Sequence, residues 1–89
     1  MRAYRIHNTV IAADIPEEAL EFYREEIRGA LPDVIGEADY AATVTCLDGV
    51  TRTVKERIHE EMEARNAWLR MSVPCELHWP FLVGTLPAE

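Results

Sequence analysis

The sequence contains few cysteines, few glycines and no long apolar segment, and each shortage excludes a class of protein. Its two cysteines, Cys46 and Cys75, are too few for a disulfide scaffold, and reduced cytoplasmic thiols are favoured over one disulfide. Four scattered glycines form no glycine-rich phosphate-binding loop. No apolar run approaches the ~18 residues of a membrane-spanning helix. We therefore expect a cytoplasmic protein.

Basic residues are also scarce. Nine lysines and arginines stand against 16 acidic residues, and the formal net charge is −7. Proteins that bind DNA or RNA neutralise phosphates with basic patches, and polybasic segments bind anionic membranes. The composition therefore argues against direct binding to nucleic acid or to a membrane.

The length and composition indicate one small folded domain. The chain has 89 residues, of which 48% are hydrophobic, a fraction typical of globular proteins. It contains no repeat, linker or low-complexity segment. We expect residues 1–89 to form a single domain.

The first half of the chain has a strand pattern followed by a helix pattern. Residues 3–13 alternate between apolar and polar positions, with Asn8 interrupting the apolar side, and this predicts one strand. A helix is predicted from Asp14, the expected N-cap, to about residue 30, with Glu17 at the capping-box position. Its apolar half comprises Ile15, Ala19, Leu20, Phe22, Tyr23, Ile27, Ala30 and Leu31. Residues 32–39 are predicted to form a loop.

The second half predicts a hairpin, a helix and a final strand. Asp48-Gly49 separates two β-branched runs, which favours a hairpin with a type I′ turn, although the second helix could instead start at Val50. Residues 55–71 are predicted to be helical, with Arg65 inside a narrow apolar stripe and paired with Glu61. Residues 75–84 alternate as a strand, and Pro80 indicates that this strand lies at an edge of the sheet or contains a bulge; the edge position suits the predicted fold.

These elements follow the order β-α-β-β-α-β. The predicted fold is an α+β ferredoxin-like sandwich, with a four-stranded antiparallel sheet and two helices on one face. This fold hosts many unrelated functions, so it predicts no particular activity.

The negative charge is concentrated in one part of the chain. From Asp14 to Asp48 there are ten acidic and two basic residues, a net charge of −8, and the remaining residues carry +1. This region indicates a binding surface for a basic partner, or alternatively a solvated face that keeps a small protein in solution. The candidate partner-binding residues are Asp14, Glu17, Glu18, Glu21, Glu25, Asp33, Glu37 and Asp39.

The charge predicts a non-enzymatic protein-binding module whose partner is a larger protein with a basic surface. We expect the chain itself to be a monomer or a weak homodimer. One version is an inhibitor that occupies a nucleic-acid-binding surface, as nucleic-acid mimics of the anti-restriction or anti-CRISPR type do. Successive helix acids are about 6 Å apart along the axis, whereas one DNA strand presents a phosphate every ~3.4 Å. Mimicry would therefore require the loop acids beside the helix.

Two alternative functions use other residues. A small enzyme or ligand-binding domain could use the open sheet face around Arg5, His7 and His78, with a histidine as general acid or base. A homodimer could form through the edge strand near Trp79 and Phe81.

The histidines and cysteines do not supply a metal site by their spacing. Cys75 and His78, or His59 and Glu63, could contact one ion, but structural zinc needs four ligands at suitable spacing. We therefore predict no metal and no cofactor.

Overall fold

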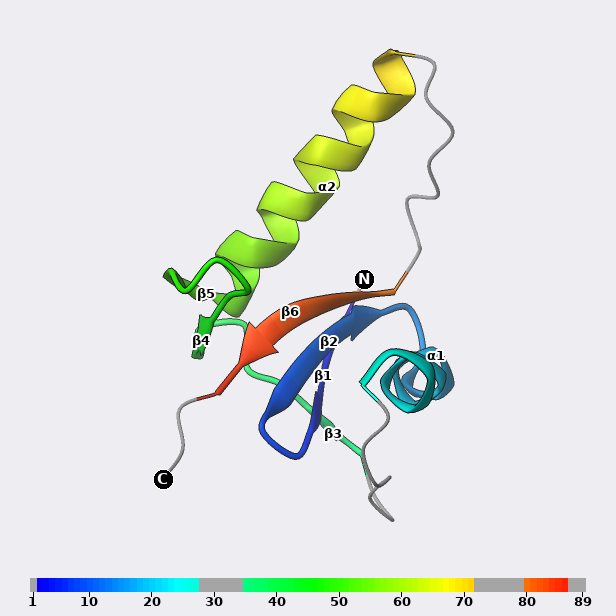
Figure 1. Cartoon of the computed structure of the whole chain (residues 1–89), viewed down its shortest axis with the longest axis vertical. Helices are drawn as coiled ribbons and strands as arrows, with labels where there is room; N and C mark the ends of the chain where they lie inside the picture. The colour runs from blue at the N-terminus through cyan, green and yellow to red at the C-terminus, as the bar shows by residue number, and fades with distance from the viewer. Residues whose placement is uncertain (1, 28–34, 72–79, 87–89) are drawn as a thin grey trace.

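The computed structural model describes residues 2–27, 35–71 and 80–86, which form an antiparallel sheet flanked by helices (Figure 1). The strand order is β3-β1-β2-β6-β4-β5. The strands are β1 (Arg2–Ile6), β2 (Thr9–Ala13), β3 (Gly36–Glu37), β4 (Thr43–Thr45), β5 (Thr51–Thr53) and β6 (Phe81–Thr85). The helical elements are α1 (Pro16–Phe22), the π-helical segment η1 (Tyr23–Ile27) and α2 (Val54–Arg70). The α+β class is confirmed, but the sheet has six strands and the four-stranded ferredoxin-like layout is wrong.

Residues 3–13 form a hairpin rather than one strand. β1 and β2 pair with Ile6 opposite Thr9, so His7 and Asn8 make a two-residue turn. His7 has a φ of 55°, as the first central position of a primed hairpin turn requires. The sequence does not reveal this turn because β2 is buried on both faces and is apolar at nearly every position. Every second residue of β2 is therefore apolar, and the apolar positions of β1 continue through it as they would in one strand. Only Asn8 marked the interruption.

β6 lies inside the sheet and not at an edge. It pairs with β2 on one side and with β4, through Thr45 and Thr85, on the other, so the edge prediction is wrong. Pro80 directly precedes β6, and its missing N–H therefore removes no hydrogen bond from within the strand. The edge strands are β3 and β5.

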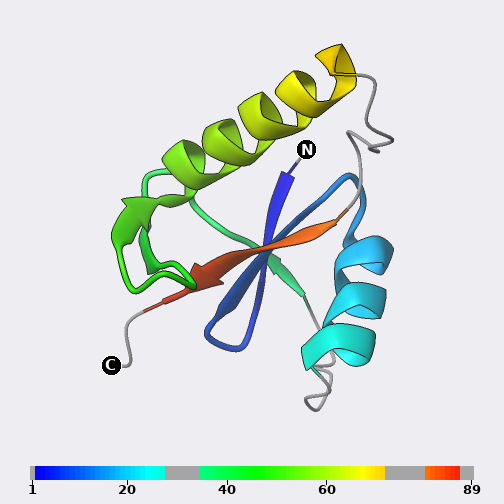
Figure 2. The same cartoon turned by 45° about the horizontal axis from the view of Figure 1, so that its top comes forward.

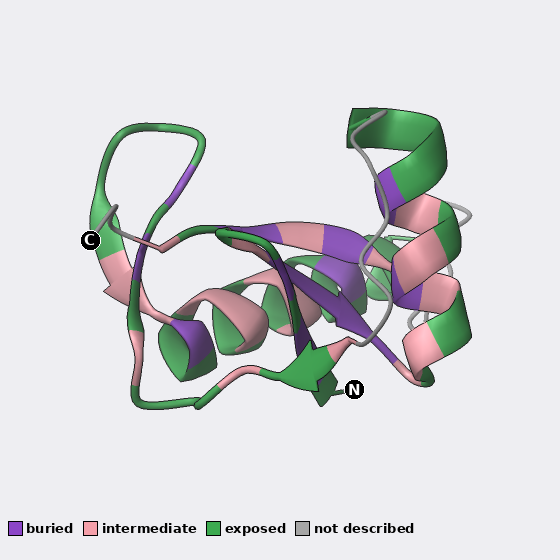
Figure 3. Ribbon diagram, turned by 90° about the horizontal axis from the view of Figure 1, so that it is seen from below, coloured by how far each residue is buried: buried purple, intermediate pink, exposed green. Residues whose placement is uncertain are grey.

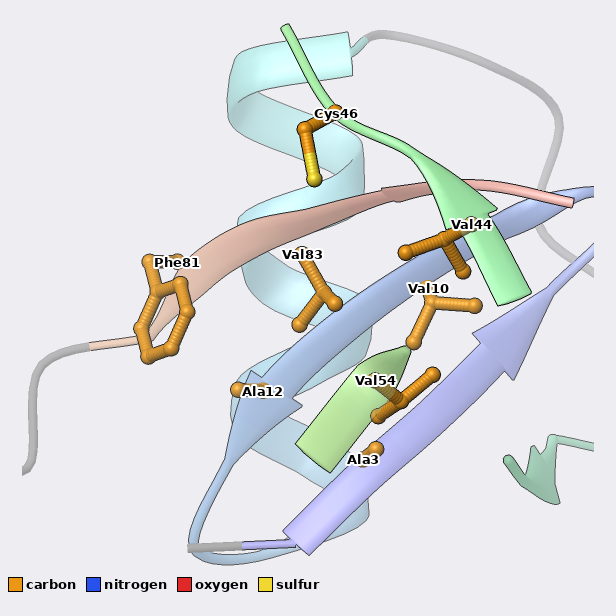
Figure 4. Packing of buried hydrophobic residues seen from close by; sticks show 8 residues of the cluster. All are labelled: Ala3, Val10, Ala12, Val44, Cys46, Val54, Phe81 and Val83. Carbon is orange, nitrogen blue, oxygen red and sulfur yellow. The ribbon is translucent and has the colours of Figure 1, made fainter. Parts of the chain in front are cut away.

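The two helices pack on opposite faces of the sheet, which corrects the prediction that both cover one face. The α1 side contains Tyr4, Ile6, Ile11, Ala13, Ala19 and Tyr23. The α2 side contains Ala3, Val10, Ala12, Val44, Cys46, Val54, Phe81 and Val83 (Figure 4). Neighbouring strand residues such as Val10 and Ile11 point to opposite faces, so each helix has its own apolar cluster. Figure 3 shows buried residues concentrated in the strands between the helices.

The starts of the helices differ in how well the sequence predicted them. α1 has Ile15 as N-cap, without a side-chain cap bond, so the predicted Asp14 cap and capping box are wrong. α2 begins at Val54 and has a capping box. The Glu56 amide donates to Thr53 Oγ1 over 3.1 Å, and the Thr53 amide donates to Glu56 Oε1 over 3.3 Å. The predicted end of the first helix lies outside the described residues.

The β4–β5 hairpin confirms the preferred prediction over a helix starting at Val50. Its turn, however, is a three-residue loop, since the Cys46 amide donates to the Val50 carbonyl over 3.0 Å and the Gly49 amide to the Cys46 carbonyl over 2.9 Å. Gly49 has a φ of 81°, whereas Asp48 is not in the positive-φ region. This is the pattern of a type I turn closed by a left-handed glycine, not of a type I′ turn.

Candidate functional site

The first helix and its π-helical continuation present a row of acidic side chains to solvent. Glu17, Glu21 and Glu25 are exposed and Glu18 is half-buried. We call these four residues the α1 acidic surface. Their orientation follows from the opposite side of the helix, where Ala19 and Tyr23 are buried against the sheet. Burial of those apolar side chains therefore turns the carboxylates outward.

Within residues 2–27, 35–71 and 80–86, no lysine, arginine or histidine forms an ion pair with the α1 acidic surface. Several arginines instead pair with other acids: Arg2–Glu37 at 3.2 Å, Arg52–Asp48 at 3.1 Å, Arg52–Glu60 at 3.2 Å, Arg57–Glu61 at 3.1 Å and Arg65–Glu61 at 3.3 Å. The α1 acidic surface therefore has no ion-pair partner among the residues that the structure describes.

The acids of the α1 acidic surface differ in their effect on the stability of the helix. Glu17 and Glu18 occupy the first turn, where the helix dipole stabilises negative charge. Glu21 lies beyond that turn and follows Glu17 by four positions, a like-charge spacing that costs about 0.2–0.5 kcal/mol. A stability role alone does not account for Glu21.

Two further predicted residues lie near this side of the sheet. Asp14 is half-buried directly before α1. Glu37 is opposite Tyr4 in the β1–β3 register and therefore shares the α1 face of the sheet. Its carboxylate already pairs with Arg2, and both side chains are more than 60% exposed, so Glu37 adds little net charge to the α1 acidic surface.

Other acids of the region lie elsewhere. Asp39 accepts a hydrogen bond from the Ala41 amide over 2.9 Å, in a turn that adjoins the first turn of α2, since the Tyr40 carbonyl accepts from the Lys55 amide. Asp33 lies outside the described residues. The predicted site residues are therefore not all brought together.

Asp48 is at the tip of the β4–β5 hairpin, which lies on the opposite side of the molecule from α1 (Figure 2). Its carboxylate accepts a hydrogen bond from the Val50 amide at 3.0 Å and from Arg52 at 3.1 Å. The Val50 amide first, and Arg52 in addition, lower the pKa of Asp48 below its usual value. Asp48 therefore belongs to a structural ion-pair group and not to the α1 acidic surface.

The structure describes two of the three residues of the alternative site, Arg5 and His7. Arg5 Nε donates to the His7 carbonyl over 2.9 Å, and the His7 ring lies 6.0 Å from the Tyr23 ring between centroids. In the pairing of β2 with β6, Thr9 is opposite Thr85, the last residue of β6. His7 therefore lies beside the far end of the last strand. His78 is outside the described residues.

Two of the candidate metal ligands, His59 and Glu63, are described and contact each other. His59 Nε2 is 3.0 Å from Glu63 Oε1, and both side chains are exposed. Among the described residues, no three histidine, cysteine, aspartate or glutamate side chains are placed to hold one ion. Cys46 is a buried free thiol, and Cys75 lies outside the described residues.

The Glu61–Arg65 pair was predicted from the sequence, but its contact with the Phe81 ring was not. The guanidinium carbon atoms of Arg65 and Arg57 lie 4.9 Å and 5.3 Å from the centre of the Phe81 ring, and both arginines pair with Glu61. Arg65 is only 5% exposed. The group attaches α2 to β6, and the only sequence signal was a cation inside an apolar stripe.

Comparison with protein-family models, with curated proteins and with solved structures found no match for this chain. Within the part of the chain that the structure describes, no helix has both the length and the apolar character needed to cross a membrane. The placement of charge is therefore the basis on which a function can be proposed.

Proposed function

We propose that this chain is a non-enzymatic protein-binding module whose α1 acidic surface engages a basic patch on a larger protein. The supporting observation is that the carboxylates on α1 and η1 face solvent without an ion pair among the described residues. Arg2, Arg52, Arg57 and Arg65 pair instead with acids of β3, the β4–β5 hairpin and α2.

Such a surface acts first on the rate of association. Unscreened carboxylates attract a cationic partner over about a Debye length, which is roughly 10 Å at 0.1 M salt, and attraction of this kind speeds encounter. Stable binding also requires apolar contact. Ile15 and Ile27 are exposed apolar side chains at the two ends of the same helical segment, and we include them in the proposed contact region.

The inhibitor version of this proposal makes the target's basic patch a nucleic-acid-binding surface. The described acids beside α1 do not reach the charge density of a duplex, which presents one phosphate per ~1.7 Å of axis, because Glu37 is paired and Asp48 is on the other side of the molecule. A short acidic row fits contact with a few lysines or arginines of the target better than replacement of a whole duplex.

The test is affinity capture from the native host with the full chain as bait, at low salt and at about 0.5 M salt, followed by mass spectrometry. We expect a basic nucleic-acid-handling protein to be retained at low salt and to be lost at high salt. Glu18→Lys, Glu21→Lys and Glu25→Lys, singly or combined, should abolish its retention. Retention that survives the combined reversal would refute the proposal, as would recovery of no partner at either salt.

A matched control separates the location of charge from its amount. Glu21→Lys with Glu25→Lys changes the net charge by as much as Glu60→Lys with Glu63→Lys, which alters exposed positions on α2. Circular dichroism confirms that each variant is folded. The proposal requires loss of capture for the first pair and retained capture for the second.

A further inference from the structure

We draw no further inference here: the strongest candidate, the exposed apolar end of α2 formed by Trp68, Leu69 and Met71, carries nothing because no contact among the described residues shows what covers it.

Discussion

Gly84 shows how one position is determined by the close approach of two strands. A Cβ atom at Gly84 would lie 2.7 Å from the Thr45 carbonyl oxygen and 3.0 Å from Val44 Cβ. Both neighbours belong to β4 and are held in the sheet, so neither can move away without disturbing the β4–β6 contact. Glycine is therefore needed here for space and not for an unusual φ.

We expect Gly84→Ala to lower the free energy of unfolding by about 1–3 kcal/mol, the usual cost of overpacking. Urea denaturation followed by circular dichroism measures this loss. Gly36→Ala is the control, because nothing lies within 4 Å of a Cβ at that exposed position. Its effect should stay within about 0.5 kcal/mol. Equal effects of the two substitutions would show that β4 and β6 are not closely apposed.

Asp48 makes a pH-dependent contribution to stability. Its pKa in the folded protein lies below the usual value for aspartate, chiefly because the Val50 amide and then Arg52 favour the ionised form. A lowered folded pKa means that the stabilisation is fully present above the unfolded pKa and is lost as the pH falls through the folded value.

The Asp48→Asn variant should therefore lose less stability than the native chain as the pH falls from about 5 to about 2. Urea midpoints measured across this range test the prediction. Parallel pH profiles for the two proteins would show that the contacts of Asp48 with Val50 and Arg52 do not stabilise its ionised form.

At the scale of elements, α2 is attached to the sheet by a charged group around an aromatic ring. Glu61 accepts from Arg57 and Arg65, whose guanidinium groups lie over Phe81. Because Arg65 is nearly fully buried, a nearby carboxylate is needed to offset the lost hydration of its guanidinium group. The ion pair and the ring contact therefore hold α2 against β6 together.

Removal of this carboxylate should be much more costly than removal of an exposed one on the same helix. We expect Glu61→Ala to destabilise the protein by about 1–3 kcal/mol, since it removes the carboxylate that both Arg57 and the buried Arg65 contact. Glu63→Ala, which removes only the exposed contact with His59, should cost no more than about 1 kcal/mol. Thermal and urea unfolding of both variants give the comparison. Indistinguishable losses would mean that Glu61 does not anchor Arg65.

Charge reversal at Glu21 tests the proposed binding role of the α1 acidic surface separately from its effect on stability. Glu21→Lys replaces a like-charge pair with Glu17 by an opposite-charge pair in the favourable order, worth about 0.2–0.5 kcal/mol. The variant should therefore be at least as stable as the native chain while losing partner capture. A thermal unfolding midpoint well below the native one would instead assign Glu21 to a structural role.

At the scale of the whole molecule, salt should act in opposite directions on folding and on binding. A net charge of −7 produces self-repulsion that salt screens, so the free energy of unfolding should rise slightly with ionic strength. Partner binding should weaken over the same range, mainly through a slower association rate. Urea unfolding and surface plasmon resonance at several salt concentrations test this. Binding that is insensitive to salt would remove the electrostatic basis of the proposed function.

Much of the local structure could be predicted from short segments of sequence. The period of α2 and the turn residues Asp48 and Gly49 indicated the second helix and the β4–β5 hairpin. The type of that turn was missed because it depends on backbone hydrogen bonds between Cys46 and Val50. The hairpin of β1 and β2 was missed because β2 is buried on both faces and so is apolar at nearly every position. Such a strand fits either register of an alternating pattern, and the pattern of β1 therefore continues through the turn.

The candidate site could be predicted only in part. The exposed row of Glu17, Glu21 and Glu25 followed from helical periodicity, since the opposite face is apolar. Pairing of Glu37 with Arg2 could not be foreseen, because it requires the contact between β1 and β3. The π-helical segment η1 also had no recognisable sequence signal.

The sequence by itself determined the charge of this protein, the α2 helix and the residues that can turn the chain, because these depend on side chains within a few positions of one another. Only the tertiary structure decided that β6 lies between β2 and β4, that the helices cover opposite faces, and which acids form ion pairs such as Arg2–Glu37. Those features come from packing between residues as distant as Val10 and Gly84, and several strand orders satisfy the same local preferences.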